Sequence, residues 1–249
     1  MQEYILEVNN LSKNYQTKNE EITALADISF AVKKGEFISI VGPSGCGKST
    51  VLSILSSLLT KSGGEVIVKD NITLGYMLQN DSLFSWRTVL DNCLLGLEVT
   101  GNLTEESKNY VIHLLEVYGL GEFMYQYPNN LSGGMRQRVA LIRTLATKPD
   151  ILLLDEAMSA LDYQSRLAIS DDIYQIIKKE GKTAIMVTHD IAEAISMSDR
   201  IIVLSKRPAV VKSIYDINLT NKSTPIHNRK CKEFSDYYDK IWRDLDVHI

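Results

Sequence analysis

Short apolar runs along the chain alternate with stretches in which apolar residues recur at every third or fourth position. Four runs predict buried strands, at residues 37–41, 151–154, 183–187 and 201–204. Between the second and third runs, isoleucines recur with helical spacing from Ile169 to Ile177, and Gly181 is a stop signal for that helix. Strands that alternate with helices favour a parallel sheet with crossover helices, so the pattern predicts an α/β fold.

The middle of the chain has a different pattern. Thr104 can cap a helix whose first turn carries Glu105 and Glu106, and Gly119 can end it. No strand signal of comparable strength lies between residues 79 and 149. We therefore expect a helical lobe at 79–149, inserted into an α/β core made of residues 1–78 and 150–205.

The two ends of the chain complete this division. Residues 4–8 and 28–32 alternate between apolar and polar side chains, which predicts antiparallel strands. Residues 206–249 are richer in charged and aromatic side chains, and we expect them to form a C-terminal extension. All of these parts belong to one expected domain, 1–249.

Composition narrows the possible functions. The net charge of −4 argues against nucleic acid as a partner. Apolar runs fall far short of the ~20 residues that span a bilayer, and the first residues lack the pattern of a signal peptide. Three widely spaced cysteines fit a reducing cytosol rather than disulfides or a zinc site. A role in transport would therefore need a separate membrane partner.

A glycine-rich segment follows the first predicted strand and precedes a predicted helix. Its glycines allow backbone N–H groups to turn inward around a phosphate, and the helix directs its positive end toward the same anion. Lys48 can meet the β- and γ-phosphates, and the Ser49 hydroxyl suits Mg²⁺. The expected nucleotide-binding residues of this segment are Gly42, Pro43, Ser44, Gly45, Cys46, Gly47, Lys48, Ser49 and Thr50.

Two further motifs lie downstream. Ser132, Gly133 and Gly134 form a small-residue turn that opens a helix, so this turn also offers free N–H groups to a phosphate. Asp155 ends a buried apolar strand, where a carboxylate is costly unless a cation such as Mg²⁺ meets it. Glu156 follows directly.

These three motifs, in this order, resemble the nucleotide-binding subunit of ATP-binding cassette (ABC) transporters, from about Tyr15 to His189. The resemblance implies a P-loop NTPase (RecA-like) core with an antiparallel β subdomain and an inserted α-helical subdomain. It also implies an ATPase that uses ATP and Mg²⁺. In such an enzyme Asp155 would belong to the metal site, and Glu156 would polarise the attacking water.

The resemblance assigns further roles. Gln79 matches the glutamine that contacts Mg²⁺ or the lytic water at the junction with the helical lobe. His189 matches the histidine that hydrogen-bonds the γ-phosphate. Tyr15 matches the aromatic residue that stacks on adenine, although a single tyrosine is also a common packing residue.

The same resemblance implies a homodimer with two shared ATP sites. The turn at Ser132 would close over the phosphate held by the partner's loop, and the loop 159–162, which includes Asp162, would cross between subunits. Ala157, Met158, Met135 and Ser85 depart from residues common in the family, but none of these changes removes a catalytic group.

The segments 86–92, 138–143 and 205–208 are similar to those in subunits of nitrate, sulfonate, taurine and pyrimidine-precursor importers. This similarity implies a peripheral subunit on the cytoplasmic face of the membrane, bound to integral permease subunits and served indirectly by an extracytoplasmic solute-binding protein. An ATPase of an exporter or of a cell-division complex is the alternative.

Two features of the sequence allow more than one interpretation. Leu83, Phe84 and Trp86 lie beside Gln79, and either fill the core of the helical lobe or line a groove for the permease. Cys46 lies inside the glycine-rich loop, so we expect alkylation of its thiol to inhibit the ATPase unless Cys93 or Cys231 reacts instead.

Overall fold

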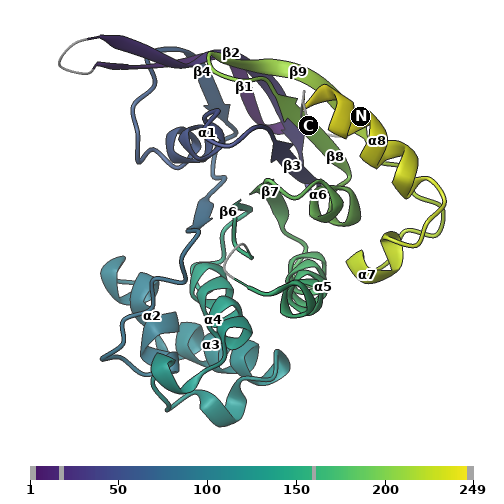
Figure 1. Cartoon of the computed structure of the whole chain (residues 1–249). Coiled ribbons are helices and arrows are strands. Elements are labelled where there is room, and N and C mark those ends of the chain that lie inside the picture. The colour runs from purple at the N-terminus through teal and green to yellow at the C-terminus, as the bar shows by residue number, and fades with distance from the viewer. Residues whose placement is uncertain (1–3, 17–19, 159–160, 246–249) are drawn as a thin grey trace.

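The structure, a computed structural model, describes residues 4–16, 20–158 and 161–245. Within these residues, strands join into one sheet in the order β4-β1-β2-β9-β8-β3-β7-β6-β5 (Figure 1). The strands are β1 (Tyr4–Gln16), β2 (Glu21–Lys33), β3 (Phe37–Val41), β4 (Gly63–Val68), β5 (Leu74–Met77), β6 (Ile151–Asp155), β7 (Thr183–Val187), β8 (Arg200–Leu204) and β9 (Ala209–Asp216).

Strands β6, β7, β3 and β8, which the apolar runs predicted, pair in parallel, and β5 adds a further parallel strand beside β6. Every residue of β3, β6 and β7 is buried, because both faces of this part of the sheet are covered. Ile40 and Asp155 both align with Val187. The chain segments that follow these three strands therefore emerge side by side at one edge of the sheet.

The antiparallel strands predicted near the N-terminus are also present. Strand β1 pairs with β2, and Val8 lies opposite Phe30. Strand β9 connects this part to the parallel strands, because it pairs with β2 on one side and with β8 on the other. The segment 206–249 therefore adds strand β9 to the sheet, and the rest of its described residues lie outside the sheet.

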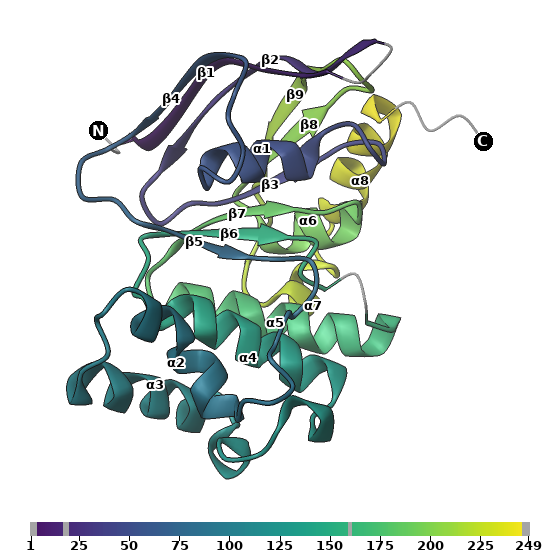
Figure 2. The same ribbon diagram turned by 90° about the vertical axis from the view of Figure 1, so that its left-hand side faces the viewer.

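Helices cover the sheet and form a lobe at one side. Figures 1 and 2 show α2, α3 and α4 grouped together away from the antiparallel strands, whereas α7 and α8 lie beside α6. Thr104 caps α3 with a capping box, as predicted. The helices are α1 (Lys48–Leu55), α2 (Val89–Val99), α3 (Glu105–Val117), α4 (Gly133–Leu145), α5 (Tyr163–Lys179), α6 (Ile191–Met197), α7 (Pro225–Asn228) and α8 (Phe234–Asp244), with 3₁₀ turns at Gly121–Phe123 and Pro128–Asn130.

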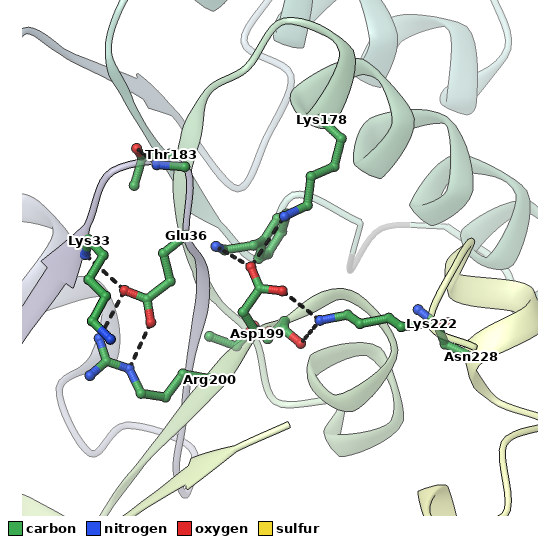
Figure 3. A network of polar contacts seen from close by, with 12 residues as sticks. Lys33, Glu36, Lys178, Thr183, Asp199, Arg200, Lys222 and Asn228 are labelled. Carbon is green, nitrogen blue, oxygen red and sulfur yellow. Dashed lines mark hydrogen bonds and ion pairs between the residues drawn. The ribbon is translucent and has the colours of Figure 1, made fainter. Parts of the chain in front are cut away.

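The C-terminal helices are fastened to the core by apolar packing and by charge. Ile241 of α8 is fully buried in one cluster with Ile191 and Ile195 of α6. Lys222 donates to Asp199 over 2.6 Å, and Lys178 of α5 lies 3.2 Å from the same carboxylate (Figure 3). Burial acts to raise the pKa of Asp199, but the contacts with Lys222, with the Phe37 N–H and with Lys178 together outweigh burial and lower this pKa.

No helix among the described residues is long and apolar enough to span a membrane.

Candidate nucleotide site

A cavity of about 490 Å³ opens at the edge of the sheet where β3, β6 and β7 end. The glycine-rich loop, the residue after β6 and a residue shortly after β7 meet there, as the register of the strands requires. The lining residues are Ser44, Gly45, Gly47, Lys48, Ser49, Thr50, Glu156, His189 and Arg207.

The loop before α1 has the backbone that the sequence predicted. Gly45 and Gly47 have φ angles of +71° and +120°, in the region that favours glycine. A side chain on Gly42 would place its Cβ 2.8 Å from the Cys46 sulfur. The Lys48 ammonium is buried, and it donates to the carbonyls of Gly42 over 2.8 Å and Pro43 over 3.1 Å. The loop thus holds a cation against its own backbone, next to the start of a helix.

Two oxygen ligands of the kind that Mg²⁺ prefers lie together below this loop. The Ser49 hydroxyl donates to the Asp155 carboxylate over 2.8 Å, and the Tyr76 hydroxyl donates to the other oxygen of Asp155 over 2.9 Å. Burial and the nearby Asp155 charge raise the pKa of Tyr76 to about 12, so Tyr76 remains a donor at neutral pH. The described residues form no cluster of three or more His, Cys, Asp or Glu side chains, so Mg²⁺ here would also need phosphate and water oxygens.

Glu156 is the point at which three predicted site residues meet. Its carboxylate accepts a hydrogen bond from Gln79 over 3.2 Å and lies 3.3 Å from Nδ1 of His189. Its backbone has a φ of 44°, which a non-glycine residue seldom adopts. The backbone N–H of Glu156 donates to Val187 over 2.9 Å, which holds the residue in this conformation. The chain therefore directs a carboxylate into the phosphate end of the cavity at a cost in backbone strain.

Tyr15 lies near the other end of the loop. Its hydroxyl is 3.3 Å from the Thr50 hydroxyl, and the Lys13 ammonium lies 5.2 Å from the centre of its ring. The ring is 38% exposed, so Tyr15 is not filling the core. Tyr15 therefore lies beside the nucleotide loop, and its role in stacking on adenine stays a prediction.

The Ser132 turn is not part of this cavity. Ser132 caps α4 and accepts from Met135, and a Cβ on Gly134 would lie 2.8 Å from Ile169. Asp162 caps α5 by accepting from Gln164 and Ser165 over 3.1 Å each. Ser159 and Ala160, from the same predicted loop, lie outside the described residues. Within one chain, the predicted site residues therefore fall into two separate groups.

Sequence reasoning missed two residues at the site. Arg207 lines the cavity, and its guanidinium donates to the Gly45 carbonyl. Tyr76 holds Asp155 from the neighbouring strand β5. The turn 205–208 was predicted only as a subfamily feature. It follows the predicted strand 201–204, and the parallel pairing of that strand with β3 brings Arg207 to Gly45, 162 residues earlier in the chain.

The expectation for Cys46 changes with the structure. Cys46 is 1% exposed, its side chain packs in the core beneath the loop, and burial raises the pKa of its thiol. Burial also raises the pKa of Cys93 to about 12. Both thiols therefore carry little thiolate at neutral pH, and thiolate is the reactive form.

We expect N-ethylmaleimide at pH 7 to label Cys231 first, because Cys231 is the one partly exposed thiol of the three cysteines. Peptide mass spectrometry after one equivalent of label should find Cys231 modified and ATPase activity retained. A Cys231→Ser variant should lose the fast labelling. Rapid labelling of Cys46 that is slowed by ATP would restore the expectation drawn from sequence.

Comparisons with known proteins point to one family. A family model described as "ABC transporter" matches residues 25–159. The uncharacterized ABC transporter ATP-binding protein YtlC of Bacillus subtilis is 43% identical over 97% of this chain and 95% of its own length. The taurine import ATP-binding protein TauB of Roseobacter denitrificans is 36% identical over 93% of this chain and 89% of its own length.

A solved structure supports the same family. The dimeric post-hydrolysis structure of the ATP-binding cassette MJ0796, bound to ADP and Pi, matches with a TM-score of 0.73 and 33% identity. This match covers 86% of this chain and 99% of MJ0796. This chain therefore belongs to the ABC transporter family, as one of its ATP-binding, ATP-hydrolysing cassettes.

Proposed function

We propose that this chain is the ATPase subunit of an importer for a small solute, working on the cytoplasmic face of the membrane through a separate permease. The observation that carries the ATPase chemistry is the meeting of Glu156, Gln79 and His189 beside the glycine-rich loop.

Each residue has a part in hydrolysis. Glu156 polarises the attacking water, His189 hydrogen-bonds the γ-phosphate, and Lys48 neutralises charge on the β- and γ-phosphates. Ser49, Asp155 and Gln79 would hold Mg²⁺ through their oxygen atoms, and the metal would stabilise charge on the phosphates. The exposed ring of Tyr15 stacks on adenine, and backbone N–H groups of the glycine-rich loop and of the first turn of α1 surround the phosphates.

A second copy completes each site. The Ser132, Gly133 and Gly134 turn presents the start of α4 away from the chain's own cavity, where its N–H groups and dipole can meet a phosphate held by a partner. Asp162 caps the start of α5 and is the last residue of the loop 159–162, which would cross between subunits. The dimeric state of MJ0796 supports a homodimer with two shared ATP sites.

Taurine importers among the relatives favour import over export, and they favour a sulfonate-type solute. The solute would reach the permease through an extracytoplasmic binding protein. The test is uptake of labelled taurine, other sulfonates, nitrate and pyrimidine precursors by cells that express this chain with the permease and binding protein encoded beside its gene. Uptake that needs intact Glu156 supports the proposal, whereas outward transport would contradict it.

The aromatic pair beside Gln79 supplies a prediction about coupling. Trp86 is 72% exposed and stacks on Phe84 with ring centres 4.9 Å apart. The Trp86 side chain therefore does not fill the core of the helical lobe. We expect Trp86→Ser to change the stability of the isolated subunit by less than about 1 kcal/mol and to leave its basal ATPase intact. In the reconstituted complex, the same change should abolish transport and solute-stimulated ATPase, because the permease would lose its apolar contact.

Leu58→Ser is the matched control, since Leu58 is 68% exposed but lies just after α1 on the α/β core. It should leave both basal and stimulated ATPase unchanged. Normal transport by the Trp86→Ser complex would rule out this segment as the permease contact.

A further inference from the structure

Arg166 of α5 contacts two functional loops at once. One end of its guanidinium donates to the carbonyl of Leu161 over 3.0 Å, and the other end lies 3.6 Å from the carboxylate of Asp190. Leu161 precedes Asp162 in the loop proposed to reach the partner subunit. Asp190 directly follows His189. A single side chain thus connects the partner-facing loop to the histidine of the chain's own site.

The backbone on both sides of His189 is also held. The N–H of Thr188 donates to Ile40 over 3.3 Å, and the N–H of Asp190 donates to the Thr188 hydroxyl over 3.0 Å. Asp190 caps α6 through the N–H of Glu193 over 3.0 Å. The Asp190 carboxylate, on the residue next to His189, thus contacts both the start of α6 and the Arg166 guanidinium.

Charged groups surround this contact inside the protein. Glu193 of α6 is 4% exposed, and burial raises its pKa to about 7, while Arg166 and Arg229 act in the opposite direction. One carboxylate oxygen of Glu193 and the Nε atoms of Arg166 and Arg229 make no hydrogen bond to described protein atoms. A buried polar atom without a hydrogen bond costs stability, so packing alone does not explain this arrangement.

The C-terminal segment holds the far end of α6. Asn228 is fully buried and donates to Ser196 over 2.7 Å, and Lys222 donates to Ser198 over 2.6 Å (Figure 3 shows both side chains). The C-terminal end of α6 is held by these bonds, and its N-terminal end is joined through Asp190 and the Arg166 guanidinium to the carbonyl of Leu161.

We propose that Arg166 is a positioning residue, which fixes the position of the His189 side chain through its ion pair with Asp190. The position of Arg166 in turn depends on the loop at Leu161 and Asp162. It would thereby make hydrolysis in one site depend on correct docking of the partner subunit. This inference rests on the proposed function, because it requires the shared sites of a homodimer. A lysine cannot replace the arginine, since an ammonium lacks the two separated donor ends.

The test is steady-state ATPase kinetics of the full-length protein. Arg166→Gln, Arg166→Lys and Asp190→Asn should each lower kcat about tenfold or more, because small misplacements of catalytic groups can cost up to ~10²-fold. The KM for ATP should stay within about twofold, since none of these side chains touches the loop that binds phosphate. Asn at position 190 can still cap α6, so Asp190→Asn separates lost charge from lost capping. Arg87→Gln, which breaks a surface ion pair with Glu98, is the control and should leave kcat unchanged.

Combining variants separates positioning from a merely structural role. In a His189→Ala background, Arg166→Gln should reduce kcat by less than about twofold further, because residues that act through one another are non-additive. A wild-type kcat for Arg166→Lys would overturn the inference, as would a full additional loss in the His189→Ala background. If Arg166→Gln fails to fold, Arg166→Lys and Asp190→Asn carry the test. Glu156→Gln in the same assay reports on the proposed function by itself, so the two proposals can fail separately.

Discussion

Glu156→Gln should lower ATP turnover by about 10²–10⁴-fold, the usual cost of losing general-base assistance. The amide keeps the size of the side chain and can still hydrogen-bond Gln79, so nucleotide affinity should change little. The ATP-bound state should then accumulate. Size exclusion with ATP and Mg²⁺ should show the variant as a dimer, while the wild type returns to monomer as hydrolysis proceeds.

Glu116→Gln is the matched control, because it makes the same change on an exposed surface of α3. It should keep wild-type turnover and show no lasting dimer. Near-normal hydrolysis by Glu156→Gln would remove Glu156 from its proposed role. A loss of ATP binding would instead point to damage at the strained backbone of residue 156, whose φ is 44°.

The parallel core could be predicted because its sequence signals are local. Strands β3, β6 and β7 are continuous apolar runs, and their burial on both faces explains why no alternation is visible. The glycine-rich loop could be read from spacing, because positive φ at Gly45 and Gly47 restricts those positions to glycine. Local rules therefore placed Ser49 and Lys48 correctly at the start of α1.

The remainder of the fold depends on contacts between distant segments. Strand β4 is a half-exposed edge strand that opens with Gly63 and Gly64, so it lacks the apolar signal of a buried strand. Strand β9 lies in a segment expected to be an extension, and its place is set by pairing with β8 and β2. No pattern within either segment reports such partners.

The direction in which the side chains point could not be predicted from the sequence either. Cys46 sits within a loop that surrounds phosphate, yet its thiol packs against the core beside Gly42. Trp86 is as apolar as a core residue but is exposed. Arg207 reaches Gly45 because it follows β8, which lies beside β3 and parallel to it, so both strands end at the same edge of the sheet. In each case, the residue type was visible in the sequence but its neighbours were not.

The division of the predicted residues into two groups has the largest consequence for the assembled protein. Ser132 is exposed and caps α4, but it does not line the cavity of its own chain. We expect Ser132→Arg to abolish hydrolysis, because a long cationic side chain would occupy the space meant for the partner's phosphate. ATP binding to the monomer should be nearly unchanged, which fluorescence titration with a labelled nucleotide can measure.

Thr104→Arg controls for the loss of a helix cap, since Thr104 caps α3 of the same lobe and is also exposed. Losing either cap should cost about 1 kcal/mol of stability. Only the change at Ser132 should stop hydrolysis. Equal loss of ATP affinity in the Ser132→Arg monomer would mean that Ser132 serves its own chain, and the shared site would be wrong.

Mixing two inactive variants gives the sharpest form of this prediction. Lys48→Ala damages the phosphate loop, and Ser132→Arg damages the turn that completes the partner's site. A heterodimer of the two has one site in which both halves are intact and one in which both are damaged. Equimolar mixing should therefore restore activity to at most one site per heterodimer, whereas each variant alone stays inactive. Because sites contained within one chain could not regain activity on mixing, recovery can arise only if the Ser132 turn of one subunit closes over the phosphate loop of the other.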